Sequence, residues 1–342
     1  MEGTEPSKED YPTKAIGFSE PSIVALLRNL DLTSIEHVLL EAYSERGRRP
    51  PYPPVAMLRA LIFQKIRQIS SWRKLASTLK HEKTWLLVLG FQKAPCHDSF
   101  SEFTKRVGPE RFRRILLILQ SQLKQKYPGL GQRIAVDSTI VRGYSNPNTA
   151  SDPDAKWGVT GQKVNRPMHV FGYKLQISSD VDFGIPLDYL VVPANRNDSR
   201  LYPEILLRTK ASGNRIDVVI ADAGYDSKRN ILLSIKHHAV PIIKLNPRRS
   251  KEKRKRRADY LLPVRRDSDE WNRYYEMRSS VERVFSRLKE ELGLNHLKLR
   301  SLERVEVHFA ICLITMTAIA TGAAATGFGQ LALCIEPWRY YG

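Results

Sequence analysis

The hydrophobic pattern divides the chain into a helical first part and a strand-rich second part. Up to about residue 130, apolar positions recur at three- and four-residue intervals, as in Val55, Leu58 and Ile62, which is typical of amphipathic helices. From Arg133 onward the apolar runs are short and rich in β-branched residues, which favours strands. A chain of 342 residues is long enough for two domains, and the change near residue 130 predicts the boundary between them.

The second part predicts strands and helices in a definite order. Three strands come first, and then a helix, a strand, a helix, a strand and a long helix that bears an acid. The elements expected before that acid-bearing helix are strands at 133–141, 168–179 and 185–194, a helix at 199–210, a strand that ends at Asp222, a helix at 228–238 and a strand at 240–245. This order predicts an α/β fold, in which helices flank a mixed sheet.

The acid-bearing helix carries a line of polar side chains beside its apolar stripe. The stretch from Trp271 to Gly293 contains good helix formers and no proline, which predicts one helix that ends at the glycine. At about 100° per residue, an arc of roughly 60° holds four polar side chains, those of Tyr275, Arg278, Glu282 and Lys289. The neighbouring arc is expected to face the core and holds Tyr274, Met277, Val281, Phe285, Leu288 and Leu292. An acid flanked by two cations suits a site for a metal and an anionic polymer, although such spacings also occur on solvated helix faces.

Two aspartates belong to predicted strands that are otherwise apolar: one lies inside its strand, and the other follows its strand directly. Asp137 interrupts the run RIAVDSTIV, and Asp222 follows the run RIDVVIA. A charge in or at the tip of a buried strand costs on the order of several kcal/mol unless it is paired or metal-bound. Together with Glu282, these carboxylates can hold two Mg²⁺ ions about 3.5–4 Å apart, as in-line phosphoryl transfer requires. Asp226 is expected to cap a helix, and Asp198 is the main rival ligand, with a loop or cap role as its alternative.

These residues resemble the active site of a known family. The helix matches the Y-x2-R-x3-E-x6-K signature of bacterial and archaeal insertion-sequence transposases with a DDE active site. Asp137 in AVDST and Asp222 in ADAGYDS look like the first and second catalytic aspartates, and Glu282 looks like the glutamate. The helical part is similar as well, through RRPPYPPVAMLRALIFQKIRQISSWRKLASTL and PCHDSFSEFTKRVG, so the resemblance covers roughly residues 48–320. The full signature is specific, whereas either aspartate motif alone is weak.

The resemblance implies a ribonuclease-H-like catalytic core, which the order of predicted elements also favours. It implies an enzyme that binds the ends of its element, cleaves DNA with two Mg²⁺ or Mn²⁺ ions, and joins the 3′-OH ends to target DNA. The three carboxylates would be both the catalytic residues and the metal ligands. Tyr275, Arg278 and Lys289 would hold DNA phosphates beside them. A homodimer that brings two terminal inverted repeats together is implied as well.

The charge of the chain agrees with a nucleic-acid partner. It has 55 Lys and Arg residues against 36 Asp and Glu residues, for a formal charge of +19, which attracts DNA phosphates but also RNA or anionic lipid. The densest run, RRSKEKRKRR at 248–257, lies in an excursion expected at about 246–268. We therefore expect Arg254, Lys255, Arg256 and Arg257 to bind DNA, with a solvated run or a nuclear-targeting signal as alternatives.

The regions expected along the chain are a flexible tail at 1–18, a helical domain at 19–130, a catalytic domain at 131–330 and a C-terminal tail at 331–342. In the helical domain, Ser71 is expected to cap the helix that follows it, and Asp98 or Ser99 the next one. Several short basic helices favour a helix-turn-helix-like DNA reader, and a bundle that serves as scaffold or dimer contact is the alternative.

The chain contains one segment long enough to cross a bilayer. No charged residue occurs from Phe309 to Ile335. Glycines, threonines and a glutamine interrupt this segment, so a buried helix at about 302–325 is expected rather than a membrane span. The three cysteines lie far apart and predict neither a disulfide framework nor a zinc site. Together with a polar N-terminus that lacks an apolar signal core, this favours the cytoplasm, at the nucleoid.

Two other function classes stay open. A domesticated or inactive DNA-binding protein would have lost a carboxylate, whereas all three candidates are present. A structure-specific ribonuclease-H-like nuclease would share the three carboxylates but would cut DNA without joining it.

Overall fold

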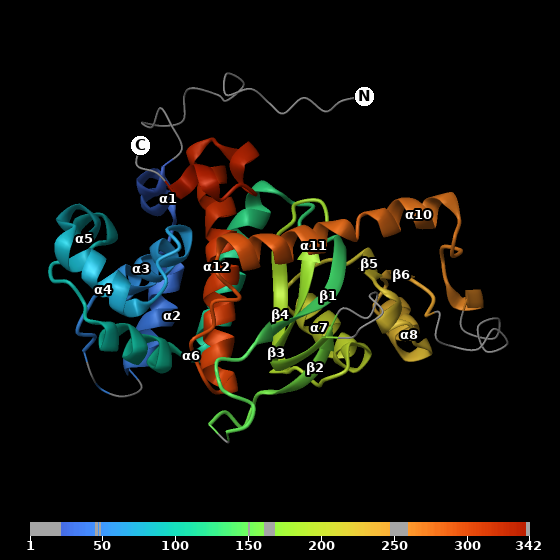
Figure 1. The fold of residues 1–342 in the computed structure, drawn as a ribbon. Coiled ribbons are helices and arrows are strands. Elements are labelled where there is room, and N and C mark those ends of the chain that lie inside the picture. The colour runs from blue at the N-terminus through green and yellow to red at the C-terminus, as the bar shows by residue number, and fades with distance from the viewer. Residues whose placement is uncertain are drawn as a thin grey trace. The chain divides into compact units, whose positions relative to one another are not determined.

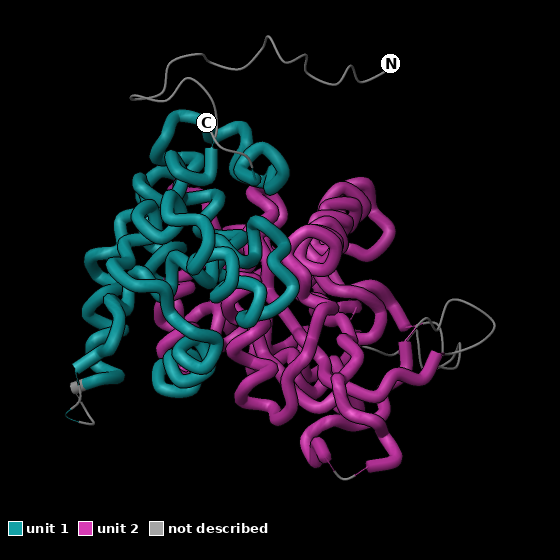
Figure 2. Tube along the Cα trace, turned by 60° about the vertical axis from the view of Figure 1, so that its left-hand side comes forward, with its two compact units in different colours: residues 1–107, 118–126, 314–342 teal, residues 108–117, 127–313 magenta. Residues whose placement is uncertain are grey.

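A computed structural model of the chain describes residues 22–44, 47, 49–149, 151–160, 168–246 and 259–339 (Figure 1). The chain divides into two compact units, which Figure 2 shows in different colours. Unit 1 comprises residues 1–107, 118–126 and 314–342, and unit 2 comprises residues 108–117 and 127–313. The helices α6 (His97–Lys126) and α12 (Leu302–Thr326) therefore each contribute residues to both units.

Unit 1 is helical in its described residues. Its elements are α1 (Ile23–Asn29), α2 (Thr33–Ser44), α3 (Pro54–Ile66), α4 (Trp72–His81), α5 (Lys83–Leu89) and parts of α6 and α12. Ser71 caps α4 by accepting the N–H of Lys74 at 3.2 Å, which confirms the predicted cap. Because α6 begins at His97, Asp98 and Ser99 lie inside its first turn, so the prediction that one of them is the cap is wrong.

The C-terminal segment belongs to the core of unit 1. Trp338 is fully buried, and its ring meets that of Phe328 edge-on at 6.1 Å. Arg67, at the end of α3, donates a hydrogen bond to the carbonyl of Arg339 at 2.6 Å, and the Arg339 side chain donates to the carbonyl of Ile66 at 3.2 Å. The expectation of a loose tail from residue 331 is therefore wrong through residue 339, because a buried indole and charged hydrogen bonds fix the segment.

Unit 2 is built on a six-stranded mixed sheet in the order β2-β3-β1-β5-β6, with β4 also paired to β3. The strands are β1 (Arg133–Arg142), β2 (Lys156–Thr160), β3 (Met168–Asp180), β4 (Pro186–Pro193), β5 (Val218–Ala221) and β6 (Val240–Ile243). β1 runs antiparallel to β3 and parallel to β5, and β5 runs parallel to β6. With the helices that flank it, this sheet confirms the ribonuclease-H-like α/β fold class.

One strand, β2, is absent from the sequence-based prediction. It is short, and its third residue is Gly158, which weakens a strand signal. A Cβ at Gly158 would lie 2.5 Å from the carbonyl oxygen of Ala194 and 2.7 Å from Cδ1 of Ile140. Close packing therefore requires a glycine at position 158. The glycine has no side chain that could contribute to a strand pattern in the sequence.

The two faces of the sheet have different neighbours. α7 (Asp198–Ala211) packs on β3 and β4, and the hydroxyls of Ser178 on β3 and Thr209 on α7 lie 2.6 Å apart. Because side chains alternate along a strand, Ile177 and its partner Asp137 on β1 face the opposite way. On that face, α11 (Ser279–Ser286) packs on β1 and β3.

The long helix expected from Trp271 to Gly293 is broken. It consists of α10 (Asp269–Glu276), α11 and a π-helical turn, η4 (Arg287–Glu291). Between α10 and α11, N–H groups bond carbonyls three residues back, from Arg278 to Tyr275 at 3.0 Å and from Ser280 to Met277 at 3.0 Å. This tighter turn changes the helical register. Among the six residues expected to face the core, four are buried and two, Tyr274 and Met277, are only half-buried. Gly293 ends the segment at a φ of +70°, as predicted.

The helix α12 accounts for the long apolar segment near the C-terminus. It is long and apolar enough to cross a membrane, but 89% of its most apolar window is buried inside the protein. Its bounds, Leu302–Thr326, agree with the buried helix predicted at about 302–325.

Candidate active site

Asp137 lies in β1, where the strand leaves the core. The preceding residues Ile134 to Val136 are fully buried, whereas 21% of the Asp137 side chain is exposed. Its carboxylate accepts the N–H of Ser138 at 2.8 Å. Burial, with a further contribution from the nearby carboxylate of Asp222, raises the pKa of Asp137 to about 7. Asp137 is therefore a carboxylate whose ionised form lacks full compensation by its protein neighbours.

Asp222 is brought beside Asp137 by the parallel pairing of β1 and β5. Val136 lies opposite Ala221, so the next residue of each strand is an aspartate. Adjacent strands are about 4.8 Å apart, close enough for two carboxylates to disfavour each other's ionised form. Asp222 also begins a 3-10 turn, η2 (Ala223–Tyr225), by accepting the N–H of Gly224 at 2.7 Å.

Glu282 is connected to Asp137 through an arginine. The guanidinium of Arg278 donates from Nη2 to Oε1 of Glu282 at 2.5 Å, and its Nη1 lies 3.5 Å from Oδ2 of Asp137. The Arg278 side chain is largely buried, whereas 56% of the Glu282 side chain is exposed. Arg278 therefore lies between two of the three candidate carboxylates and compensates part of the charge of both.

Lys289 and Tyr275 approach the same carboxylates. Burial lowers the pKa of Lys289, and Asp137 is among the anions that oppose this shift. Burial raises the pKa of Tyr275, and its charged neighbours include Arg278, Asp222 and Asp137. All four polar residues of the signature thus lie around the strand ends, although the helix that carries them is broken.

Two residues missed by the sequence analysis complete the surroundings of Tyr275. Its ring stacks on Trp271 with a centroid distance of 4.7 Å and an interplanar angle of 12°. The ammonium of Lys244, just beyond β6, lies 5.5 Å from the Tyr275 centroid, and the Arg278 guanidinium lies 5.9 Å from it. The four-residue spacing of Trp271 and Tyr275 on a helix indicates that the two rings can meet. Nothing in the sequence around Lys244 indicates its contact with Tyr275.

A buried polar cluster supports β1 from the opposite face. The hydroxyl of Ser138 donates to Oδ1 of Asp198 at 2.7 Å. The ammonium of Lys174 donates to the same oxygen at 2.7 Å and to the carbonyl of Arg196 at 2.6 Å. Nearby, burial and the surrounding carboxylates raise the pKa of Tyr225 well above its ordinary value. Ser138 thus fixes the strand at the residue next to Asp137.

The rival ligand Asp198 and the expected cap Asp226 both have ion-pair partners. Asp198 pairs with Lys174, and Asn197 caps α7 in its place. Ser227 caps α8 (Lys228–Lys236), so the expectation that Asp226 is that cap is wrong. Instead, the buried carboxylate of Asp226 pairs with Arg266 at 2.9 Å.

Arg266 ties together the two ends of the basic excursion. Its Nε donates to the carbonyl of Ile243 at 3.0 Å, and its two terminal nitrogens pair with Asp226 and, at 2.5 Å, with Asp259. The predicted DNA-binding residues Arg254 to Arg257 lie outside the described residues. Their role stays a prediction.

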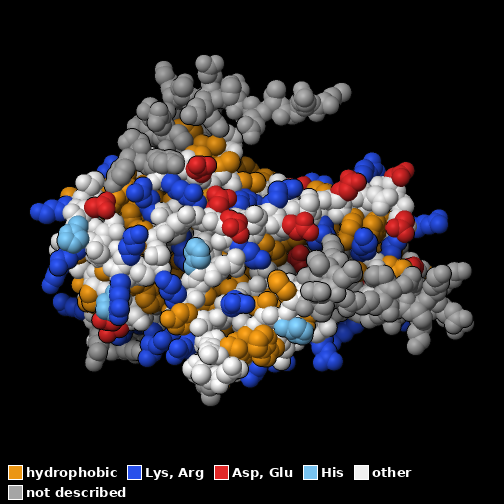
Figure 3. All heavy atoms as spheres, in the orientation of Figure 1, with side chains coloured by type: hydrophobic (Ala, Val, Ile, Leu, Met, Phe, Trp, Pro, Cys, Tyr) orange, Lys and Arg blue, Asp and Glu red, His pale blue; other side chains and the backbone are white. Residues whose placement is uncertain are grey.

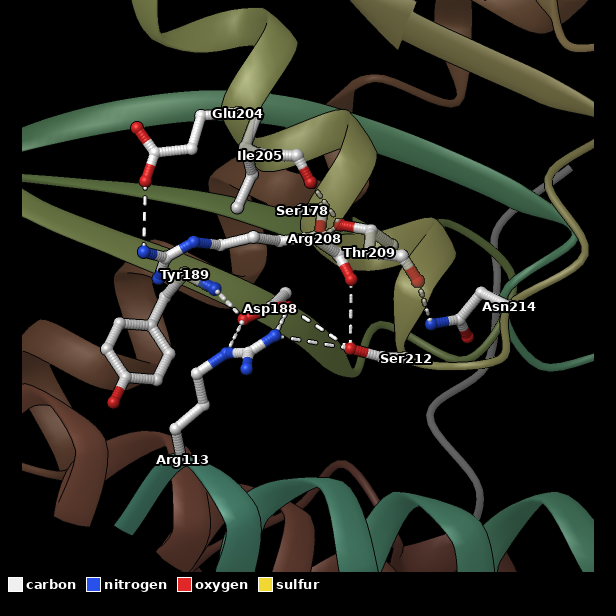
Figure 4. Close-up of polar contacts among 10 residues, drawn as sticks. All are labelled: Arg113, Ser178, Asp188, Tyr189, Glu204, Ile205, Arg208, Thr209, Ser212 and Asn214. Carbon is white, nitrogen blue, oxygen red and sulfur yellow. Dashed lines mark hydrogen bonds and ion pairs between the residues drawn. The ribbon is translucent and has the colours of Figure 1, made fainter. Parts of the chain in front are cut away.

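Another buried aspartate of the same sheet has a full set of partners (Figure 4). Asp188 on β4 accepts two hydrogen bonds from Arg113, at 2.9 and 2.6 Å, one from the Ser212 hydroxyl at 3.2 Å and one from the N–H of Tyr189 at 2.9 Å. No part of the Asp188 side chain is exposed. Its saturated hydrogen bonding is that of a structural residue.

Carboxylate oxygens are the ligands that Mg²⁺ and Mn²⁺ prefer. Asp137 and Asp222 fit such an ion, because a cation beside them would stabilise the ionised form of Asp137, whose pKa burial raises. Within the described part of the chain, however, no three Asp, Glu, His or Cys side chains form a group that can hold a metal ion. Glu282 is held by Arg278 instead.

The comparison with known proteins identifies the family. Residues 128–318 match the Transposase DDE domain, and residues 18–106 match the Transposase domain (DUF772). The first match covers more than half of the chain, and the chain therefore belongs to the family of transposases with a DDE domain. No curated protein matches the sequence.

Solved structures of transposases are also similar to this chain. One is a piggyBac transposase synaptic complex with hairpin DNA, at 10% identity and a TM-score of 0.47, with 91% of this chain and 79% of that chain covered. Another is a Mos1 transposase paired-end complex with the left transposon end, at 12% identity and a TM-score of 0.22, with 84% of each chain covered. Because both scores are below 0.5, the family assignment rests on the sequence matches.

Proposed function

We propose that this transposase binds the ends of an insertion sequence, cleaves the DNA at those ends and joins the freed 3′-OH groups to target DNA. The observation that carries the proposal is the parallel register that makes Asp137 and Asp222 neighbours, beside the cations of Arg278 and Lys289. Acidic and basic groups in one place suit chemistry on a phosphodiester, which needs metal ligands and phosphate contacts together.

In the proposed mechanism, Asp137, Asp222 and Glu282 would hold two Mg²⁺ or Mn²⁺ ions. When bound, such ions would lower the pKa of a water and neutralise charge on the leaving oxygen. Water attacks the phosphorus and the bond to the 3′ oxygen breaks, which leaves a 3′-OH and a 5′-phosphate. In the joining step, that 3′-OH attacks a target phosphodiester and displaces a target 3′ oxygen.

The cations and the phenol position the DNA. Arg278 and Lys289 lie beside Asp137 and hold phosphates next to the reacting one. Tyr275 is held flat by Trp271 and offers its hydroxyl to the same strand. For Glu282 to act as a ligand, Arg278 must release it, and an approaching phosphate is the anion that takes its place on the guanidinium. Binding of DNA and completion of the site are thus coupled through Arg278.

Unit 1 supplies recognition of the element ends in this proposal, and two copies of the chain assemble on paired ends. Because unit 1 includes the C-terminal segment, the test uses the full chain. Replacing the exposed Arg73 and Lys74 of α4 by alanine should lower affinity for the terminal repeat more than affinity for random DNA. An equal loss for both sequences would assign these residues to the phosphate backbone alone.

The test of the chemistry is Glu282→Gln, with Glu276→Gln as the matched control on the exposed side of α10. Cleavage of a labelled duplex that carries the terminal repeat is measured with Mg²⁺, with Mn²⁺ and with chelator. We expect Glu282→Gln to fold and bind DNA but to lose cleavage by orders of magnitude, because the amide keeps the shape and loses the charge. Normal cleavage by this variant would remove Glu282 from the site. Cleavage without joining in the wild-type chain would favour a nuclease.

A further inference from the structure

The β2 edge of the sheet carries an exposed aromatic residue on the face that holds Asp137. Asp137 is paired with Ile177 on β3, and Phe171 lies six residues before Ile177, on the same face. Phe171 is in turn paired with Trp157 on β2. Trp157 is 53% exposed, and Val159, two residues on, is exposed as well. Figure 3 shows hydrophobic side chains gathered over this edge of the sheet.

The register fixes the distance from this edge to the catalytic carboxylates. The carbonyl of Phe171 accepts the N–H of Gly143 at 2.9 Å, so Trp157 lies level with a residue six positions beyond Asp137 on β1. Six residues span about 20 Å along a strand, and two strand spacings add about 10 Å across the sheet. The separation is therefore about 22 Å. At about 3.4 Å per base pair, this is the length of roughly six base pairs of duplex.

Exposed cations and a second aromatic ring lie on segments next to this end of the sheet. The segment 295–300 follows the signature helix, and Lys298 and Arg300 are exposed on it. The Arg300 guanidinium lies 5.7 Å from the ring centroid of Tyr144, which is itself 56% exposed. The N–H of Leu302 donates to Asp154 at 2.9 Å, which fixes the end of the segment to the loop that precedes β2. The segment that follows the signature helix thus brings exposed cations and an aromatic ring to the loop that precedes β2.

We propose that Tyr144, Trp157, Lys298 and Arg300, the edge strip, form a second DNA-binding surface, which takes the duplex about six base pairs from the scissile phosphate. Lys298 and Arg300 bind backbone phosphates, and the Trp157 ring packs against the deoxyribose of the same groove wall. The inference rests on the proposed function, because it places the reacting phosphate at Asp137. In this proposal the edge strip binds the DNA next to the cleavage position and keeps that DNA aligned during cleavage.

The charge of the strip selects DNA over a second copy of the chain. In a symmetric contact each patch meets itself, so the cations would be placed against cations. β2 is also a five-residue strand that starts with the exposed Lys156, and an edge lysine opposes strand pairing. A duplex, in contrast, neutralises the cations and releases counterions.

The first experiment measures the salt dependence of binding to a 20-base-pair duplex in chelator, so that no cleavage is needed. Replacing both Lys298 and Arg300 by alanine should flatten the slope of log K against log salt by about 1.8, from about 0.9 for each lost phosphate contact. Trp157→Ala should weaken binding roughly tenfold, about 1.4 kcal/mol. The matched controls lie on the opposite face of the sheet: Lys228→Ala with Arg229→Ala on α8, and Leu207→Ala on α7. These control variants should change neither the salt slope nor the affinity for the duplex.

The second experiment locates the contact. A photo-crosslinking residue at position 157 should join the duplex about six base pairs from the cleavage position, and the effect of Trp157→Ala should vanish on a duplex cut back to about four base pairs on that side. An unchanged salt slope, with cleavage intact in the wild-type chain, overturns the edge strip and leaves the proposed function standing. A reduced slope in a chain that does not cleave DNA supports the edge strip and overturns the proposed function. Loss of dimers in Trp157→Ala at unchanged DNA affinity assigns the edge to a second copy and overturns the proposal.

Discussion

Two aspartates of one sheet, Asp188 and Asp137, meet opposite environments. Asp188 is fully buried and accepts bonds from a bidentate arginine, a hydroxyl and a backbone N–H. Among the described residues, Asp137 accepts one backbone N–H and has a guanidinium 3.5 Å away, and it lies beside another carboxylate. A carboxylate with a complete set of donors stabilises the fold. One with an incomplete set is costly for the fold, which makes it the candidate for binding something else.

The most direct test of this difference is to replace each of the two aspartates by asparagine. Asp137→Asn should lower metal-dependent cleavage by about a thousandfold or more and leave the fold intact. Asp222→Asn and Glu282→Gln should act alike, and the double variants should lose little more, because the three residues work as one unit. Cleavage of a terminal-repeat duplex, with circular dichroism as the folding control, measures both effects. Additive losses would show that the three carboxylates act independently.

Asp188→Asn should do the opposite. It leaves the half-buried Arg113 without its anion, and removal of one partner of a buried pair costs about 3–5 kcal/mol. Urea denaturation should show this loss of stability, and the folded fraction of the variant should cleave DNA at the wild-type rate. The double variant Asp188→Leu with Arg113→Met should regain part of the stability, because it removes both charges together. A stable Asp188→Asn protein without cleavage would reverse the roles of the two aspartates.

A smaller effect should appear in the pH dependence of stability. The pKa of Asp137 is about 7 in the folded chain, above the ordinary value of 3.8. Between pH 4 and 7 the folded state binds the proton more tightly than the unfolded state, so Asp137 makes the protein less stable as the pH rises, and the penalty is complete above pH 7. In chelator, Asp137→Asn should therefore melt at a higher temperature than wild type at pH 8 and at the same temperature below pH 4. Added Mg²⁺ should stabilise only the wild type at pH 8. Equal melting at both pH values would show that Asp137 is already fully compensated.

The smallest effects should come from the residues that grip DNA. Lys289→Ala should weaken end binding, and the difference should shrink as salt rises, because its ammonium is one phosphate contact among many. Neutralising Arg254 to Arg257 should lower affinity for all sequences alike and flatten the salt slope by about 0.9 per lost contact. Neither change should alter which metal supports cleavage. If neutralising residues 254–257 left the salt slope unchanged, the basic run would be solvated and would make no contact with DNA.

Local chemistry in the sequence was enough to predict most of the elements around the candidate site, whereas the catalytic roles of its carboxylates stay a prediction. An aspartate that interrupts an apolar strand and another that ends one are visible without a structure, and the signature helix supplies Glu282. The break at Met277 was not visible, because every residue around it is compatible with a helix. Strand β2 was hidden by Gly158, whose necessity arises from packing against Ala194.

Long-range partners were the other part that sequence reasoning could not reach. The helix that follows Ser227 predicts a cap role for Asp226, whereas the partner of Asp226 in the fold, Arg266, lies 40 residues away. The pairing of Asp188 with Arg113 spans 75 residues. Both pairs exist only once the fold has brought the two elements together, and neither leaves a periodic signal in the chain.

The closure of unit 1 by the C-terminal segment has a consequence for biosynthesis. Ile66 and Arg339, which share a hydrogen bond, are 273 residues apart. A chain emerging from the ribosome presents the helices of unit 1 first, but Trp338 joins their core only after residues 127–313 of unit 2 have been made. Unit 2, which ends at residue 313, can form in the meantime. The helices that are made first are therefore packed only after the sheet of unit 2, and a copy terminated between residues 313 and 338 has a complete sheet and an unsealed helical unit.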